Sequence, residues 1–195
     1  MEIARINDPV ASSDRSSDEA ALARAARGGD RQAYALLYDL NVDAIYRYAF
    51  YRTRSDAEAE DVTAETFHRA LVAMPRYEPR RPFRAFLYTI ARNVIVDRAR
   101  RARPQASFED AIAHPSDAPG PEESALRFDD ARRLRAAVAE LTPLQQEIVI
   151  LRYLEDRSTA EVAAITGKPE STIRGIQMRA LAALRALMRS QEAEA

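Results

Sequence analysis

Arginine side chains recur on one face of a predicted helix near the C-terminal end of the sequence. At about 100° per residue, the residues after Pro169 place a small, polar and basic set within one arc that contains no acid. This arc holds Ser171, Arg174, Gly175, Met178, Arg179, Ala182 and Arg185. The opposite arc is apolar and must face a core; it holds Ile173, Ile176, Ala180, Leu184 and Leu187. Arginine can donate two hydrogen bonds to a phosphate or to a guanine, so the basic face suits duplex DNA.

A short helix and a sharp turn are predicted just before this face. Ser158 and Glu161 form a capping box that begins a helix, and Gly167 and Pro169 end it. A short helix, a glycine-containing turn and a second helix are typical of the helix-turn-helix, whose second helix enters the major groove. The alternative is an ordinary helical hairpin with a solvated basic face.

A second basic surface is predicted on a helix over residues 82–103. On its helical wheel a core stripe holds Phe83, Phe86, Leu87, Ile90 and Val94. A separate arc holds Arg84, Tyr88, Arg92 and Arg103, and the preceding loop adds Arg76, Tyr77, Arg80 and Arg81. Arginine binds phosphates and an aromatic ring stacks on an unpaired base, so this surface suits a single strand of nucleic acid. The alternative is an arginine-rich face that only contacts solvent.

Catalytic and metal-binding patterns are weak in this sequence. Glu65 and His68 have the Glu-x-x-His spacing of di-iron helical bundles, but such a site needs two of these motifs. The other histidine, His114, lies in a proline-rich stretch. No Ser/His/Asp set or glycine-rich phosphate loop is apparent, so we expect no enzymatic activity, no metal and no cofactor.

Charge and proline content divide the chain. Residues 56–65 hold five acidic residues and no basic one, whereas residues 76–103 hold nine arginines against two acidic residues. Residues 104–126 carry four prolines among acidic residues, which indicates a linker. The sequence thus predicts an all-α protein of two small helical domains. The predicted parts are a disordered tail (1–17), a first domain (18–103), the acidic linker (104–126), a second domain (127–190) and a tail (191–195).

Helix start and stop signals place the individual elements. The expected helices span residues 18–27, 30–52, 55–74, 82–103, 127–140, 143–154 and two more on either side of Gly167. The absence of cysteine and of any apolar run near the ~20 residues that span a bilayer indicates a cytoplasmic protein without membrane insertion. The N-terminal residues also lack the apolar core of a signal peptide.

Several segments, in this order and spacing, resemble the bacterial extracytoplasmic-function (ECF) sigma factors over residues 18–190. These are EDVTAETFHRAL, PFRAFLYTIARNVIVDRARR and LTPLQQEIVILRYLEDRSTAEVAAITGKPESTIRGIQMRALAALR, with the acidic linker between the last two. The resemblance implies that the first domain corresponds to sigma region 2 and the second to region 4. It also implies that the partners are core RNA polymerase and promoter DNA, with an anti-sigma factor as a further candidate partner.

The resemblance assigns roles to particular residues. It implies polymerase binding by Asp61 and Glu65, although Ala64 stands where the family usually has Gln. For the −10 element, the resemblance implies contacts by Arg92 and Asn93 and by the loop that holds Arg76 and Tyr77. The basic arc on the wheel of residues 82–103 adds Arg84 and Tyr88 to the expected −10 contacts. It implies contacts to the −35 element by Ser171, Thr172, Arg174, Gly175, Met178 and Arg179. Many members have TVKSRLHRA where this chain has TIRGIQMRA, so both arginines are retained while Gly175 and Ile176 depart from the pattern.

The expected function is therefore that of an alternative sigma factor, which directs promoter-specific initiation and assists promoter melting. One alternative is a helix-turn-helix regulator that acts without docking on polymerase. Another is an interaction module that binds a protein and does not read DNA. Reconstitution with core polymerase separates these three classes.

Overall fold

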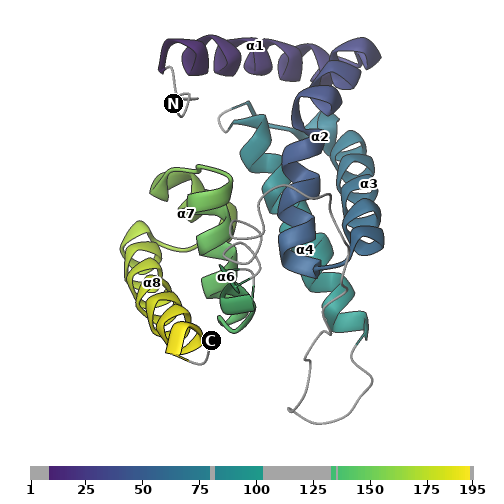
Figure 1. Cartoon of the computed structure of the whole chain (residues 1–195). Helices are drawn as coiled ribbons and strands as arrows, with labels where there is room; N and C mark the ends of the chain where they lie inside the picture. The colour runs from purple at the N-terminus through teal and green to yellow at the C-terminus, as the bar shows by residue number, and fades with distance from the viewer. Residues whose placement is uncertain (1–8, 80–81, 103–132, 135, 194–195) are drawn as a thin grey trace, which may run out of the picture. The chain divides into compact units, whose positions relative to one another are not determined.

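Helices account for all of the secondary structure in the part of the chain that the structure describes. This computed structural model describes residues 9–79, 82–102, 133–134 and 136–193 (Figure 1). The chain divides into two compact units, the first made of residues 1–49 and 56–107 and the second of residues 50–55 and 108–195. The predicted all-α class with two helical domains is confirmed. The predicted linker and Arg103 lie outside the described residues.

The first two helices are separated by a glycine turn. α1 spans Pro9–Arg27 and α2 spans Arg31–Thr53. Gly29 has a φ of 97°, a left-handed value that glycine adopts without the steric cost other residues meet. The Asp30 carboxylate then caps α2, because it accepts the backbone N–H of Ala33 at 3.0 Å.

Helix α1 begins at Pro9, within the segment 1–17 that the sequence predicts to be a tail. Residues 1–8 lie outside the described part of the chain. Proline suits the first turn of a helix, where its missing N–H would have no partner in any case. Once the buried Ala23 and Ala26 hold α1 in place, each further residue adds to an existing helix without a new nucleation step.

Two further helices complete the first unit. α3 spans Asp56–Ala73, the single turn η1 spans Met74–Arg76, and α4 spans Phe83–Ala102. α3 and α4 pack against each other. The bounds of both helices agree with the predicted ones to within about one residue.

Helix α2 lies against both α3 and α4. The ring centroids of Tyr38 on α2 and Phe67 on α3 are 4.6 Å apart, and those of Tyr48 on α2 and Tyr88 on α4 are 5.3 Å apart. Tyr48 and Tyr88 are both fully buried. The core of the first unit also includes Leu37, Ile45, Val62, Phe83, Leu87 and Val94.

In the described part of the second unit, helical residues at 133–134 and 136–139 precede four assigned elements. These are α6 (Pro143–Val149), η2 (Ile150–Leu154), α7 (Thr159–Thr166) and α8 (Glu170–Ala193). One cluster of its core is formed by Ala137, Leu141, Val149, Ala180 and Leu184.

Capping boxes begin α6 and α7, and the one at α7 is the predicted box of Ser158 and Glu161. The backbone N–H of Thr142 donates to Oε1 of Gln145 at 3.1 Å at the start of α6. At the start of α7, Ser158 Oγ accepts the backbone N–H of Glu161 at 3.1 Å. In return, Glu161 Oε2 accepts the N–H of Ser158 at 2.8 Å. Each box satisfies backbone donors that a helix start otherwise leaves without partners.

The predicted helix over residues 143–154 is a regular α-helix only in its first half, Pro143–Val149. Ile150–Leu154 winds as a π-helix, and the N–H of Glu155 donates to the carbonyl of Ile150, five residues earlier, at 3.0 Å. A single wide turn of this kind often marks a functional position in a helix.

Candidate nucleic-acid interface

The exposed face of α8 is the one that the helical wheel predicts. The exposed side chains are Ser171, Thr172, Arg174, Met178, Arg179, Ala182 and Arg185, with Gly175 partly exposed. The predicted core stripe is buried at Ile173, Ile176, Ala180 and Leu184 and partly buried at Leu187. Met178 is 73% exposed, so this apolar side chain is mostly outside the core of its own domain. The face can accommodate a partner with both apolar and anionic groups.

Helix α7 and a tight turn hold α8 in position. Val162 and Ile165 of α7 are buried, and α7 packs against α8. Gly167 ends α7 with a φ of 70°, and its N–H donates to the carbonyl of Ala163 at 2.9 Å. This left-handed residue is the usual helix stop before a sharp turn. The predicted helix-turn-helix arrangement is confirmed.

Arg174 has one acidic neighbour on its own helix. Its Nη1 lies 3.2 Å from Oε2 of Glu170, and the two side chains are 61% and 48% exposed. An exposed pair four residues apart contributes only about 0.3–0.5 kcal/mol. A DNA phosphate or base can therefore replace Glu170 as the partner of Arg174 at small cost.

Sequence reasoning missed one contact at the edge of this face. Nε2 of Gln177 on α8 donates to the hydroxyl of Tyr153 on η2 at 2.7 Å. The two residues are 24 positions apart and lie on different helices. No periodic signal could have paired them.

The predicted exposure of Tyr88 is wrong. The side chain is fully buried, and its ring meets that of Tyr48 nearly edge to face, at 71° between planes. The wheel assumed that α4 buries one stripe against one neighbour. In the structure α4 packs against α3, and α2 covers the arc that holds Tyr88.

The predicted exposure of Tyr77 is wrong as well. This side chain is 5% exposed, and its ring centroid lies 5.7 Å from that of Phe83 and 5.1 Å from that of Phe86. An aromatic side chain next to an apolar helix start gains more from this packing than from solvent. Neither tyrosine presents its ring for base stacking in this conformation.

Arg84 makes hydrogen bonds to other residues of the first unit. Its Nε donates to Oδ1 of Asn41 at 2.7 Å, and its Nη2 donates to the carbonyl of Leu40 at 3.1 Å. Asn41 is fully buried, and its Nδ2 donates to the carbonyl of Leu37 at 2.9 Å. Arg84 thus satisfies a buried amide oxygen and connects α4 to α2.

The remaining predicted −10 residues lie nearer the surface. Arg76 and Asn93 are exposed, and Arg92 is partly buried. Arg80 and Arg81 lie outside the described residues.

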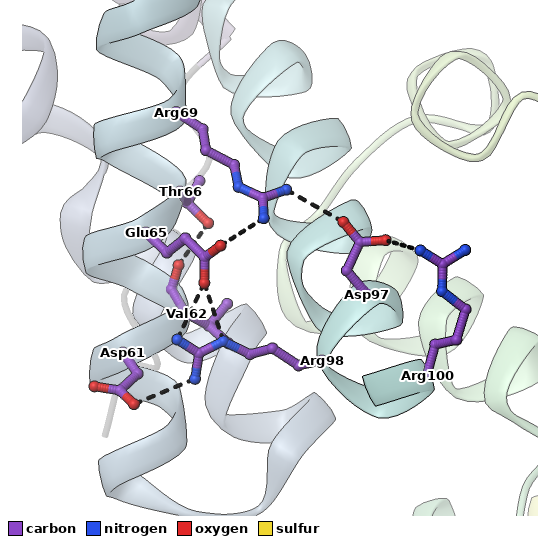
Figure 2. Close-up of polar contacts among 8 residues, drawn as sticks. All are labelled: Asp61, Val62, Glu65, Thr66, Arg69, Asp97, Arg98 and Arg100. Atoms are coloured by element: carbon purple, nitrogen blue, oxygen red, sulfur yellow. Dashed lines mark hydrogen bonds and ion pairs between the residues drawn. The ribbon is translucent and has the colours of Figure 1, made fainter. Parts of the chain in front are cut away.

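The two predicted polymerase-binding carboxylates share one arginine (Figure 2). Arg98 on α4 places Nε and Nη2 each 3.1 Å from Oε2 of Glu65, and its Nη1 lies 3.2 Å from Oδ2 of Asp61. The Asp61 side chain is 69% exposed, whereas that of Glu65 is 27% exposed. Asp61 is therefore far more accessible to a partner than Glu65.

The network continues across α3 and α4. Nη2 of Arg69 lies 2.5 Å from Oε1 of Glu65, and its Nη1 lies 3.4 Å from Oδ2 of Asp97. Arg100 then approaches Asp97 at 3.5 Å. Burial would raise the pKa of Glu65, but hydrogen bonds from Arg98 and Arg69 outweigh burial and hold this pKa below its ordinary value.

Neither a metal site nor a membrane span is found in the described part of the chain. His68 is exposed, while the Glu65 carboxylate is occupied by the two arginines. No three His, Cys, Asp or Glu residues among those described could together hold a metal ion. No described helix is long and apolar enough to cross a bilayer.

Comparison with known families assigns both units. The model of Sigma-70 region 2 matches residues 37–105, and that of Sigma-70 region 4 matches residues 137–186. The ECF RNA polymerase sigma factor BldN of Streptomyces coelicolor is 38% identical over 183 residues, covering 92% of this chain and 69% of the relative. The chain belongs to the extracytoplasmic-function sigma factors.

This sigma factor is similar to other members across nearly its whole length. The ECF sigma factor SigC of Mycobacterium tuberculosis is 35% identical over 173 residues, covering 87% of this chain and 91% of the relative. Among solved structures, CnrH in complex with the cytosolic domain of CnrY has a TM-score of 0.70 at 26% identity, covering 89% of this chain and 98% of that chain. The sigma factor RpoE of Bartonella quintana, solved with the anti-sigma factor NepR, shares the fold at a TM-score of 0.63 and 23% identity. That match covers 80% of this chain and 96% of that one.

As an alternative sigma factor, the protein directs promoter-specific transcription by RNA polymerase. The region 2 match includes α3 and α4, and the region 4 match includes α6, η2 and α7 and most of α8. A helix-turn-helix regulator without polymerase docking would not need the first unit. That alternative is not favoured.

Proposed function

We propose that this sigma factor reads the −35 element with the N-terminal half of α8. Arg174 and Arg179 make the base contacts, and Met178 meets a thymine methyl group. The remaining contacts, mainly to the backbone, come from Ser171, Thr172 and the main chain at Gly175. The observation that carries this proposal is the exposure of both arginines and of Met178 on the side of α8 away from its buried apolar stripe.

The first unit contacts the −10 element through its polar side chains. Arg76 and Asn93 are exposed, and Arg92 lies partly exposed on the same helix as Asn93. Three of the predicted −10 residues support this surface from within. The rings of Tyr77 and Tyr88 are buried, and the guanidinium of Arg84 donates to Asn41. An unpaired base would have to displace packed aromatic rings in order to stack on them.

Docking on core polymerase uses the exposed face of α3. Asp61 is the contact residue, since its carboxylate is mostly exposed and has one arginine partner in Figure 2. Glu65 acts by holding Arg98 and Arg69 in place. A partner with its own arginine or lysine can exchange with Arg98 at Asp61 without opening the contact at Glu65.

The role of the protein is binding and not catalysis, and it is exerted in the cytoplasm, where core polymerase meets the chromosome. An inhibitory protein is a further partner. CnrH and RpoE, which are similar to this chain, were each solved with another protein, and NepR is named an anti-sigma factor.

Reconstituted transcription tests the −35 assignment. Core polymerase with the wild-type chain is used to select promoters from a random library, and the selected promoter is then transcribed with Arg174→Ala and Arg179→Ala variants. Each variant should lose about 5- to 150-fold of its preference for the selected −35 sequence, the equivalent of one bidentate arginine–guanine pair.

Arg189→Ala serves as the matched control. It removes the same charge from an exposed position on the same helix, about 22 Å along the axis from Arg174. It should leave −35 preference unchanged, because a recognition helix contacts bases with its N-terminal residues. Equal loss in all three variants would show a general charge effect and remove the assignment.

A further inference from the structure

Tyr153 and Gln177 form a side-chain pair beside the DNA-reading face of α8. Gln177 Nε2 donates to the Tyr153 hydroxyl at 2.7 Å. Gln177 is partly buried, whereas Tyr153 is 49% exposed. A half-exposed aromatic side chain with an ordered hydroxyl is well suited to bind a partner, because little conformational freedom remains to be lost.

The local backbone fixes the position of Tyr153. The residue lies in the π-helical turn Ile150–Leu154, so its side chain points where a regular α-helix would not direct it. The loop that follows is fastened by Arg157, whose Nε donates to the carbonyl of Glu155 at 2.6 Å. Its Nη1 donates to Oε1 of Glu161 at 3.2 Å. Tyr153 is thus held from both its own turn and α8.

The pair lies at one edge of the exposed face. On the helical wheel Gln177 is about 60° from Arg174, on the side away from Met178 and next to the buried stripe. When the centre of a recognition helix faces base edges, the flanks of the helix face the phosphates that line the groove. Tyr153 extends this flank with a side chain from a second helix.

The direction of the hydrogen bond leaves Tyr153 able to donate. Its oxygen accepts from Gln177, so its own O–H proton remains available for another acceptor. The hydroxyl is neutral, and a backbone phosphate oxygen is an acceptor at the groove wall. A hydrogen bond to such a charged acceptor is stronger than one between neutral groups.

We propose that Tyr153 is a second DNA-contact residue of this domain, which donates its hydroxyl proton to one backbone phosphate beside the −35 element, and that Gln177 is its positioning residue. This inference rests on the proposed function of α8. It adds a contact from η2 that fixes how α8 is oriented in the groove.

The test measures promoter binding by the holoenzyme formed from core polymerase and the full chain. Single phosphates flanking the selected −35 element are replaced, one at a time, by neutral methylphosphonates. Tyr153→Phe removes only the hydroxyl and should weaken binding about fivefold. At one phosphate the methylphosphonate should weaken wild-type binding and leave Tyr153→Phe binding unchanged. The salt dependence should not change, since a neutral hydroxyl releases no counterion.

Two further variants separate contact from structure. Gln177→Met keeps the length of the side chain but removes its hydrogen bond to Tyr153. The loss of binding caused by the methylphosphonate at that same phosphate should therefore be smaller, and no other phosphate should become sensitive. Tyr38→Phe is the matched control, since Tyr38 is 41% exposed but lies on α2. It should bind like the wild type at every phosphate.

Three results would overturn the inference. The first is a Tyr153→Phe holoenzyme that keeps the full wild-type phosphate profile. The second is a loss spread evenly over all phosphates, which would indicate a purely structural role. In both cases the wild type would still select its −35 element, so the proposed function would stand. The third is a wild-type holoenzyme that does not select a −35 element, which removes the proposed function and this contact together.

Discussion

Arg98 approaches Glu65 with two nitrogens, Nε and Nη2, each 3.1 Å from the same carboxylate oxygen, although the residues are 33 positions apart. The contact joins α4 to α3, and Figure 2 shows that the guanidinium also reaches Asp61. The helix that carries the predicted polymerase-binding acids is therefore held by an arginine of the helix that carries predicted −10 residues. The predicted docking surface on α3 and the predicted −10 surface on α4 therefore share one structural support.

Arg98→Gln should destabilise the protein modestly. It removes the ion pairs with Glu65 and Asp61, and partly exposed pairs in a network are each worth about 0.2–1 kcal/mol. The free energy of unfolding, measured by urea denaturation, should fall by about 1 kcal/mol. Arg100→Gln is the control, because Arg100 is 78% exposed and meets Asp97 only at 3.5 Å. An equal effect of both variants would contradict a special role for Arg98.

The contribution of Glu65 to the stability of the fold should depend on pH. Its folded pKa lies below the ordinary value of 4.5, so the charged form favours folding. The stabilisation by Glu65 is complete above pH 4.5 and is lost as the pH falls through the lower pKa of the folded state. Denaturation of the wild type and of Glu65→Gln, followed from pH 7 down to pH 3, should show a difference that shrinks toward the acid end. A difference that grows as the pH falls would contradict the direction of the shift.

Asp61→Asn should weaken the binding of core polymerase without weakening the fold. Its side chain is 69% exposed and has a single ion pair at 3.2 Å, so little internal stability depends on it. We expect about fivefold lower affinity for core polymerase, measured by titration of labelled chain, and a free energy of unfolding within about 0.5 kcal/mol of the wild type. Asp39→Asn on the exposed side of α2 is the control. Unchanged affinity for Asp61→Asn would place the docking surface elsewhere.

Alanine at the two glycines of the helix-turn-helix should have opposite effects on stability. Gly167 has a φ of 70°, so alanine there is strained and should cost about 1 kcal/mol. Gly175 is within α8 and has nothing within 4 Å of an added Cβ, so alanine should stabilise the helix by about 0.5–1 kcal/mol. In thermal unfolding, the midpoint temperature of Gly167→Ala should fall and that of Gly175→Ala should rise.

Gly175→Ala also tests how closely α8 approaches DNA. The added methyl group meets no atom of the protein itself, so any loss of promoter binding in a more stable variant must come from contact with DNA. A loss would support close approach of the backbone at Gly175. Unchanged binding would show that the glycine at this position is not needed for DNA contact.

Several features could be predicted from the sequence because short-range physics decides them. The capping boxes at Thr142 and Ser158 and the glycine stop at Gly167 depend on residues within one or two turns. The buried and exposed faces of α8 follow from helical periodicity, because this helix packs on one side only. The family resemblance rested on the same local segments and agrees with the matches to both sigma regions.

Tertiary structure decided what periodicity could not. Tyr88 is buried because α2 covers a face of α4 that a single wheel leaves open. Glu65 meets Arg98 and Tyr153 meets Gln177 only because separate helices bring them together, across 33 and 24 residues of chain. A helical wheel describes one helix in isolation, whereas burial and ion pairing depend on every neighbour that packs against it. The sequence by itself therefore determined most helix starts and stops and the exposed basic face of α8. The packing of the helices decided which of the predicted side chains are accessible to a partner.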